Sequence, residues 1–273
     1  MKIFITIFLI TLSLLAQERE ERIVSLSPSI TEIVYGLKAG AMLQATSSYS
    51  LYPNAAKKLP IVGSYNNPNI EKIISYSPTL VIGQTFNAKT LAMLQTFHIK
   101  TLQLNLKTLK NIKNAITLLA KTLDKKREGA LLLQNINEAI KEIPKNKKPH
   151  TVMIVYGLSE DLRSGIYIAG KNIFFDDIIK LSGNTNCYTN KTISQPVLNY
   201  ENIIALNPDQ IIILHSHATE PNVNVKEALK SWYSLPTKAS KNGNISIVDE
   251  DYLHIPSQRV ALTIKRLTRE MND

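Results

Sequence analysis

The stretch that decides the fold is residues 199–212, NYENIIALNPDQII, which has a counterpart at residues 69–82, NIEKIISYSPTLVI. Asparagine, glutamate, an isoleucine pair, proline and a closing aliphatic pair recur in the same order, and Glu71 and Glu201 are 130 residues apart. A period of this length is too long for a solenoid repeat. The chain is therefore predicted to contain two domains of similar construction, each with one copy of the same unit.

Each copy predicts a short helix followed by a buried strand. The isoleucine pair faces inward, Pro78 and Pro208 cannot continue the helix, and the aliphatic runs that follow are typical of a parallel sheet covered on both faces. Glu71 and Glu201 lie in the first helical turn, where the helix dipole favours an anion. Either they are only N-terminal charges, or one acidic residue on each lobe docks a partner.

Composition limits the function classes. The chain has 273 residues, 44% of them hydrophobic, and Lys and Arg exceed Asp and Glu by 10. The basic residues are scattered, and the densest group, residues 141–148, looks like a solvated loop between prolines. Since no aromatic residues interleave with it to stack on bases, we expect no nucleic-acid binding.

The N-terminus predicts export. Lys2 is followed by a short apolar run that ends at Ala16, which is the pattern of a secretory signal peptide over residues 1–16 and is too short for a comfortable membrane span. An uncleaved membrane anchor is the alternative. Cys187 is the only cysteine, which excludes an intramolecular disulfide and a cysteine-based metal site.

The remaining pattern is that of α/β units. A strand at residues 22–26 precedes Ser29 and Glu32, which are spaced as a capping box of the next helix. The loops at 46–53 and 61–65 are expected at strand ends, where open α/β sheets present ligand sites. Further strands are predicted at 97–104, 151–157, 166–170 and 245–248, and further helices at 172–183 and from about residue 258.

A long helix is predicted between the two copies. Apolar residues recur at steps of three and four over residues 109–143, and one such helix would be about 50 Å long. Gly129 is the position where it would bend or break. We therefore expect an N-terminal lobe at 22–105, a stiff connecting helix at 106–145 and a C-terminal lobe at 150–273.

Together these motifs resemble the periplasmic substrate-binding proteins of ABC importers for metal chelates, and among them the cobalamin binders. The resemblance covers the whole mature chain and is carried by residues 26–28 with 31–32, 47–50 with 52–53, 69–82, 167–170, and 251–252 with Ser257 and Arg259. It implies an α/β fold of the class III periplasmic binding protein type: two Rossmann-like lobes joined by one long rigid helix, with the ligand between them.

The resemblance also implies roles for individual residues. Tyr49 and the loop Asp251-Tyr252-Leu253-His254-Ile255 match ligand-contacting positions, and Tyr65 stands where the cobalamin binders have a tryptophan in the cleft. The alternative is that Tyr49 and Tyr65 are rim aromatics and His254 a loop residue, with no ligand contact. Glu71 and Glu201 match glutamates that pair with arginines of the transporter's membrane subunits. Most tryptophans of the cobalamin site are missing, since Trp232, which we expect in the core, is the only one. Aromatic rings suit a planar macrocycle, and a phenol or imidazole could ligate its metal.

Three other positions have two interpretations each. Arg163, near Tyr167, is either a contact for a carboxylate of the ligand or an exposed surface residue. His215 and His217 follow the second repeat strand on one face, and they are either weak candidates for a metal site, together with His254, or the polar end of a strand.

We therefore expect a monomeric periplasmic binding protein, not an enzyme, with no intrinsic cofactor. Its ligand would be a metal chelate (cobalamin, haem, a ferric siderophore, or a nickel or cobalt complex), and its partner the transmembrane permease of an ABC importer. An exported metallo-hydrolase is the competing function, although the chain has no Gly-x-Ser-x-Gly, His-Glu-x-x-His or phosphate-binding glycine loop. A surface interaction protein, anchored in the membrane by its uncleaved signal segment, is the third possible function.

Overall fold

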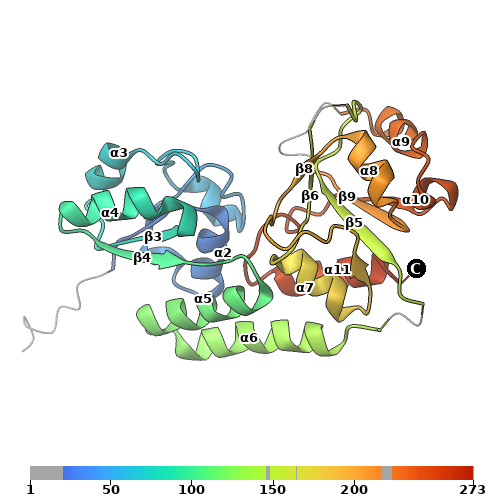
Figure 1. Ribbon diagram of the computed structural model, residues 1–273. Helices are drawn as coiled ribbons and strands as arrows, with labels where there is room; N and C mark the ends of the chain where they lie inside the picture. Colours follow the sequence, from blue (N-terminus) through green and yellow to red (C-terminus); the bar gives the residue numbers. More distant parts are fainter. Residues whose placement is uncertain (1–20, 146–147, 164, 217–222, 273) are drawn as a thin grey trace, which may run out of the picture. The chain divides into compact units, whose positions relative to one another are not determined.

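The computed structural model describes residues 21–145, 148–163, 165–216 and 223–272. The chain divides into two compact units, which are described separately (Figure 1). The first unit contains residues up to Ser27 and residues 41–103, and the second contains residues 28–40 and 104–273. No helix among the described residues is long and apolar enough to cross a membrane. The predicted signal segment, residues 1–16, lies outside the described residues.

The first unit is built on a four-stranded sheet with the order β2-β1-β3-β4. Strand β1 pairs in parallel with β2 on one side and β3 on the other. Its buried core combines aliphatic residues of these strands with those of the helices. The elements are β1 (Ile23–Ser25), β2 (Leu43–Ala45), η2 (Asn54–Lys58), α3 (Ile70–Ser75), β3 (Leu80–Gln84), η3 (Thr85–Asn87), α4 (Ala88–Thr96) and β4 (Lys100–Leu104).

The second unit is built on a six-stranded mixed sheet with the order β10-β9-β5-β6-β8, and β7 also pairs with β5. β5, β9 and β10 are parallel, whereas β6 and β8 are antiparallel to their neighbours. Trp232 is fully buried in the core, as predicted. The strands are β5 (Thr151–Tyr156), β6 (Ile166–Ile168), β7 (Thr185–Asn186), β8 (Val197–Leu198), β9 (Gln210–Leu214) and β10 (Ile245–Val248). The helices are α2 (Pro28–Gly36), α5 (Leu109–Thr122), α6 (Lys126–Lys141), α7 (Phe174–Leu181), α8 (Tyr200–Leu206), α9 (Val225–Tyr233), α10 (Lys238–Lys241) and α11 (Val260–Glu270).

Both copies of the repeated unit fold as predicted. α3 leads to β3 in the first unit, and α8 leads to β9 in the second. Asn69 caps α3 by accepting from the Lys72 N–H, and Asn199 caps α8 by accepting from the Asn202 N–H. The fold class is confirmed: each unit is an α/β layer structure with parallel strands.

The connecting segment is a helical hairpin, so the prediction of one unbroken helix is wrong. The chain turns between α5 and α6, where Asp124 adopts a left-handed backbone with φ 52°. The two helices then pack on each other, and Lys113 Nζ donates to Asn137 Oδ1 at 3.1 Å (Figure 1). Both helices belong to the second unit.

Gly129 does not break a helix but lets α5 and α6 approach closely. A Cβ added there would lie 2.4 Å from the Ala120 Cβ, far inside van der Waals contact. We expect Gly129→Ala to lower the free energy of unfolding by about 1–3 kcal/mol, even though alanine favours a helix by about 1 kcal/mol. Urea denaturation measures this. The double variant Gly129→Ala with Ala120→Gly restores the space, and an equally unstable double variant would contradict this explanation.

Helix α2 belongs to the second unit although the N-terminal lobe was predicted to span residues 22–105. It packs on α6 and on the residues just before α11, since a Cβ added at Gly36 would lie 3.0 Å from Gln258 and 3.2 Å from Leu132. The capping box expected from Ser29 and Glu32 is wrong. The helix already begins at Pro28, and the Glu32 carboxylate is bound by residues near the C-terminus.

Candidate functional site

Four exposed aromatic side chains lie at the carboxyl ends of the parallel strands of the first unit. We call Tyr49, Tyr52, Tyr65 and Phe86 the aromatic surface; between 42% and 56% of each residue is exposed. The loop at 46–53 follows β2, and η3 with Phe86 follows β3. The end of parallel strands is where open α/β sheets bind ligands.

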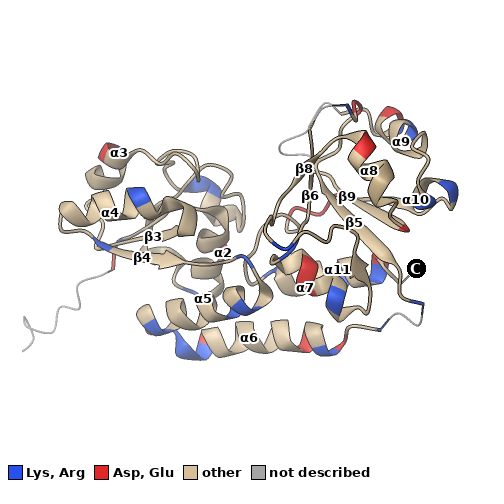
Figure 2. Ribbon diagram, in the orientation of Figure 1, with Lys and Arg blue, Asp and Glu red and all other residues tan. Residues whose placement is uncertain are grey.

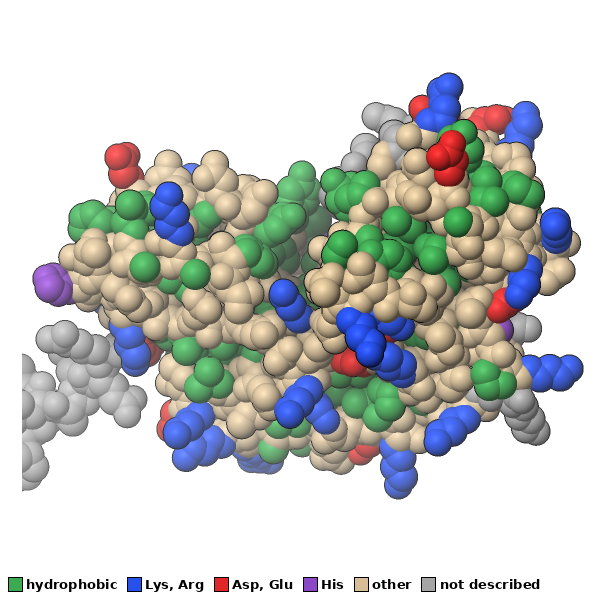
Figure 3. Space-filling model, in the orientation of Figure 1, with side chains coloured by type: hydrophobic (Ala, Val, Ile, Leu, Met, Phe, Trp, Pro, Cys, Tyr) green, Lys and Arg blue, Asp and Glu red, His purple; other side chains and the backbone are tan. Residues whose placement is uncertain are grey.

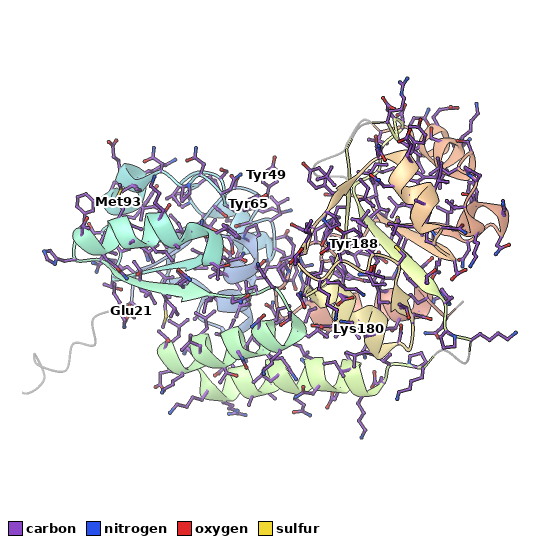
Figure 4. All side chains as sticks on the ribbon, in the orientation of Figure 1. Glu21, Tyr49, Tyr65, Met93, Lys180 and Tyr188 are labelled. Atoms are coloured by element: carbon purple, nitrogen blue, oxygen red, sulfur yellow. The ribbon has the colours of Figure 1, made fainter. Side chains whose placement is uncertain are left out.

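Hydrogen bonds hold the three loops of the aromatic surface side by side. The Ser48 N–H donates to the Gly63 carbonyl (2.9 Å), and Asn87 Nδ2 donates to the Tyr65 carbonyl (2.7 Å). The rings of Tyr65 and Phe86 meet edge to face, with centroids 5.8 Å apart. The structure thus brings together Tyr49 and Tyr65, which lie near each other on this unit (Figure 4).

Tyr49 has a strained backbone. Its φ is 63°, in the left-handed region that a bulky residue rarely adopts and that costs about 1–3 kcal/mol. The loop around it is tied, because Thr46 Oγ1 donates to Ser50 Oγ at 2.8 Å and the Leu51 N–H donates to the Tyr49 carbonyl at 3.0 Å. Strain that is held this firmly is typical of residues whose side chain is presented for a function.

In the second unit, the predicted 251–255 loop is part exposed and part core. The side chain of Asp251 is 69% exposed, whereas Leu253 is fully buried. Tyr252 and Ile255 are half-buried. His254 is also half-buried, with its ring centroid 6.1 Å from that of Tyr156. A role for these residues in ligand contact stays a prediction.

Arg259 fixes this loop and binds a buried carboxylate. Its Nη1 donates to Asp251 Oδ1 (2.9 Å), and the guanidinium lies 5.7 Å from the centre of the Tyr252 ring. Its Nε and Nη2 donate to the two oxygens of Glu32 (2.9 and 2.5 Å), and Ser257 Oγ donates to Glu32 as well (2.5 Å). Burial raises the pKa of the Glu32 carboxyl, and the hydrogen bonds from Arg259 and Ser257 oppose that rise.

The other candidates for ligand or metal contact do not form a centre. Arg163 is exposed and forms a bidentate ion pair with Asp161. The hydrogen bonds from Arg163 lower the pKa of the Asp161 carboxyl. His215 is buried at the end of β9, and His217 lies outside the described residues. No group of three or more His, Cys, Asp or Glu side chains that could hold a metal ion occurs within the described ranges.

The two predicted docking glutamates occupy equivalent places. Glu71 lies in the first turn of α3 and Glu201 in the first turn of α8, and both are exposed. Within the part of the chain that the structure describes, no ion pair neutralises either carboxylate; Tyr200 Oη makes a long 3.5 Å hydrogen bond to Glu201. Each unit therefore presents an unneutralised anion at the N-terminus of a short helix.

Comparison with known proteins gives the family. Residues 23–252 match the family model described as periplasmic binding protein. The chain belongs to the periplasmic binding protein family. The match covers both units and both copies of the repeat.

Related periplasmic binding proteins are found by sequence and by structure. A vitamin B12-binding protein of Vibrio vulnificus is 29% identical over 256 residues, which are 90% of this chain and 88% of that protein. Among solved structures, the haem-binding protein HutB of Vibrio cholerae has a TM-score of 0.78 at 23% identity, covering 93% of this chain and 100% of that chain. The vitamin B12-binding protein BtuF of Vibrio cholerae has a TM-score of 0.72 at 24% identity, covering 92% and 96%. These structures share the fold.

Sequence reasoning missed part of the exposed apolar surface of this periplasmic binding protein. Tyr52 and Phe86 were not predicted to join Tyr49 and Tyr65. In the second unit, Tyr167 of β6 and Val197 of β8 are a directly opposite, exposed cross-strand pair. The alternation Ile166-Tyr167-Ile168, with only the tyrosine exposed, was the available signal.

Proposed function

We propose that this protein is the periplasmic solute-binding component of an ABC importer. It captures a metal chelate with a large planar ring system, such as a corrin or a porphyrin, and delivers it to the membrane permease without altering it. The proposal rests on membership of the periplasmic binding protein family, whose relatives include vitamin B12- and haem-binding proteins. The signal segment at residues 1–16 would export the chain, which then acts as a monomer in the periplasm.

The aromatic surface is the observation that carries this proposal. Aromatic side chains bind flat ring systems by stacking and edge contacts, and the phenol of Tyr49 is able to ligate a metal from one face of the ring. The four residues offer no carboxylate, thiol or imidazole for acid–base or nucleophilic chemistry. Binding rather than turnover is therefore the function that this surface supports.

Delivery would use the two glutamates. We propose that Glu71 and Glu201 pair with basic residues of the permease, one on each unit. Charged residues at the rim of an interface mainly set the encounter rate and the orientation of the partners. Two anions in equivalent places on two similar units fit a partner built from two similar subunits.

Titration with defined chelates tests the binding function. We expect saturable one-to-one binding of cyanocobalamin or hemin by isothermal titration calorimetry and difference absorption, with a ferric hydroxamate siderophore and a nickel–histidine complex as comparisons. Binding of the nickel complex alone would move the assignment to a nickel chelate. No saturable binding of any of the four would overturn the proposal.

Substitutions in the aromatic surface test the site itself. We expect Tyr49→Ala and Tyr65→Ala each to weaken chelate binding about tenfold, close to 1.4 kcal/mol, because each removes one ring contact. Tyr49→Phe keeps the aromatic ring and removes only its hydroxyl group. A changed absorption spectrum of the bound chelate in this variant would identify the Tyr49 hydroxyl as a metal ligand. Phe97→Ala is the matched control, since Phe97 is an equally exposed ring of the same unit outside the surface. An equal loss in the control would rule out this site.

A further inference from the structure

The positive charge of the chain is concentrated in one segment. Residues 107–148 contain eleven Lys and Arg against four Asp and Glu, a net charge of +7 out of +10 for the whole chain. Residues 149–273 contain twelve basic and thirteen acidic residues, a net charge of −1. The scattered distribution expected from the sequence is therefore wrong for the second unit, because most of its excess charge comes from one hairpin and its flanks.

Five of these eleven basic residues are exposed on α5 and α6. α5 contains no acidic residue, and its Lys110 and Lys121 are exposed. α6 adds the exposed residues Lys126, Arg127 and Lys141. We call these five residues the basic face; blue segments of ribbon mark the two helices in Figure 2, and blue side chains lie along the same edge in Figure 3.

The neighbouring helix strengthens the basic face. α11 packs alongside α6, and Lys265 Nζ pairs with Glu142 Oε2 at 2.8 Å. Glu142, one of the four acidic residues in 107–148, is thereby neutralised by a lysine that lies outside this segment. Within the described residues, no ion pair is formed by any of the five members of the basic face.

The chemistry of the basic face fits a diffuse anionic surface. Ten of the eleven basic residues in the segment are lysines, which act as mobile point charges and do not form the bidentate pairs by which arginine recognises a single carboxylate or phosphate. Residues 107–148 contain no aromatic residue for stacking on nucleic-acid bases. The charges follow two helices, and α6 alone is about 24 Å long at 1.5 Å per residue.

We propose that the basic face of the α5–α6 hairpin binds the surface of a bilayer that carries anionic phospholipids. Clusters of four or more Lys and Arg residues are attracted to such surfaces, and the attraction falls off within a Debye length. α8, which carries Glu201, lies at the other end of the second unit from the hairpin (Figure 1). A protein attached by the hairpin therefore presents Glu201 away from that bilayer, so attachment and docking at the permease are separate states.

Vesicle flotation of the full chain tests this proposal. We expect binding to vesicles of phosphatidylcholine with one quarter phosphatidylglycerol, no binding to pure phosphatidylcholine, and release by 0.5 M salt. The quadruple variant K110E/K121E/K126E/R127E should lower the vesicle-bound partition coefficient by about a hundredfold or more, since each basic residue near an anionic surface contributes roughly fivefold. Failure of the unaltered protein to float with the anionic vesicles would overturn the proposal.

A control with the same net charge separates location from total charge. K89E/K100E/K226E/K241E reverses four exposed lysines elsewhere and should keep its partition coefficient within about tenfold of the unaltered protein. An equal loss in both variants, or equally tight binding of the unaltered protein to soluble polyglutamate, would overturn the proposal. If the reversed hairpin fails to fold by circular dichroism, K110Q/K121Q/K126Q/R127Q takes its place, with an expected loss of about a hundredfold at the same contribution per residue. Chelate affinity should be unchanged in the hairpin variants, so this test is independent of the proposed transport function.

Discussion

Arg259→Met is expected to lower the free energy of unfolding by about 3–5 kcal/mol, because it leaves the buried carboxylate of Glu32 without its ion-pair partner. Only 3% of the Glu32 side chain is exposed, and Arg259 supplies two of its three hydrogen bonds from other side chains. Urea denaturation followed by circular dichroism measures the loss. Arg163→Met is the matched control, since it removes an exposed arginine from an exposed pair and should leave stability unchanged.

The loss should depend on pH in a defined direction. Burial already raises the pKa of Glu32, and removing Arg259 takes away the main influence that lowers it. A carboxyl whose pKa is higher in the folded state than in the unfolded state loses stability as pH rises through the folded-state pKa. The deficit of Arg259→Met should therefore be larger at pH 7.5 than at pH 4.5. Equal deficits at both values would mean that lost packing, not the buried charge, is the cause.

A double variant separates the ion pair from the burial of two polar groups. Replacing both partners, as in Glu32→Leu with Arg259→Met, removes the uncompensated charge and should recover most of the stability lost in Arg259→Met. Glu32→Leu alone completes the cycle, and a double variant whose loss equals the sum of the two single losses would show that the residues act independently. A double variant as unstable as Arg259→Met would contradict the uncompensated charge as the cause of the loss.

Glu71→Lys combined with Glu201→Lys is expected to abolish chelate uptake in cells while leaving chelate binding intact. The two carboxylates lie in first helical turns and are not members of the aromatic surface, so their reversal costs the fold only about 0.3–1 kcal/mol each through the helix dipole. Uptake of labelled chelate and calorimetry on the purified variant measure the two quantities. Each single variant should give an intermediate uptake.

The control for docking uses glutamates in the same structural position. Glu128 and Glu227 also lie in first turns, of α6 and α9, and Glu128→Lys with Glu227→Lys makes the same change in net charge. This control should transport normally. Normal uptake in the Glu71 and Glu201 double variant, or equal loss in the control, would exclude the docking role.

The elements that could be predicted from sequence are those with local signals. The repeated unit was predictable because an asparagine cap, an inward isoleucine pair, a helix-ending proline and an aliphatic run all lie within fourteen residues. Tyr49 and Tyr65 could be proposed from the resemblance, and the structure places both on one exposed surface.

The elements that could not be predicted depend on contacts between distant residues. The apolar pattern of residues 109–143 continues through the turn between α5 and α6, because each helix buries an apolar stripe of the same period. The chain reverses at Asp124, whose left-handed backbone is seen only in the structure. Glu32 and Arg259 are 227 residues apart, so no local pattern distinguishes their pair from a helix cap. Phe86 joins the aromatic surface only because hydrogen bonds bring its loop beside the loops of Tyr49 and Tyr65.

The assignment of α2 to the second unit has a consequence for engineering and for the exchange of segments between relatives. The chain crosses from one unit to the other three times, after Ser27, after Gly40 and after Gln103. Neither unit can be obtained by a single cut, and a fragment ending near residue 105 would contain Glu32 without Arg259. Chimeras of this protein with a relative should therefore be built by transferring residues 41–103 alone, as a cassette within an otherwise intact host.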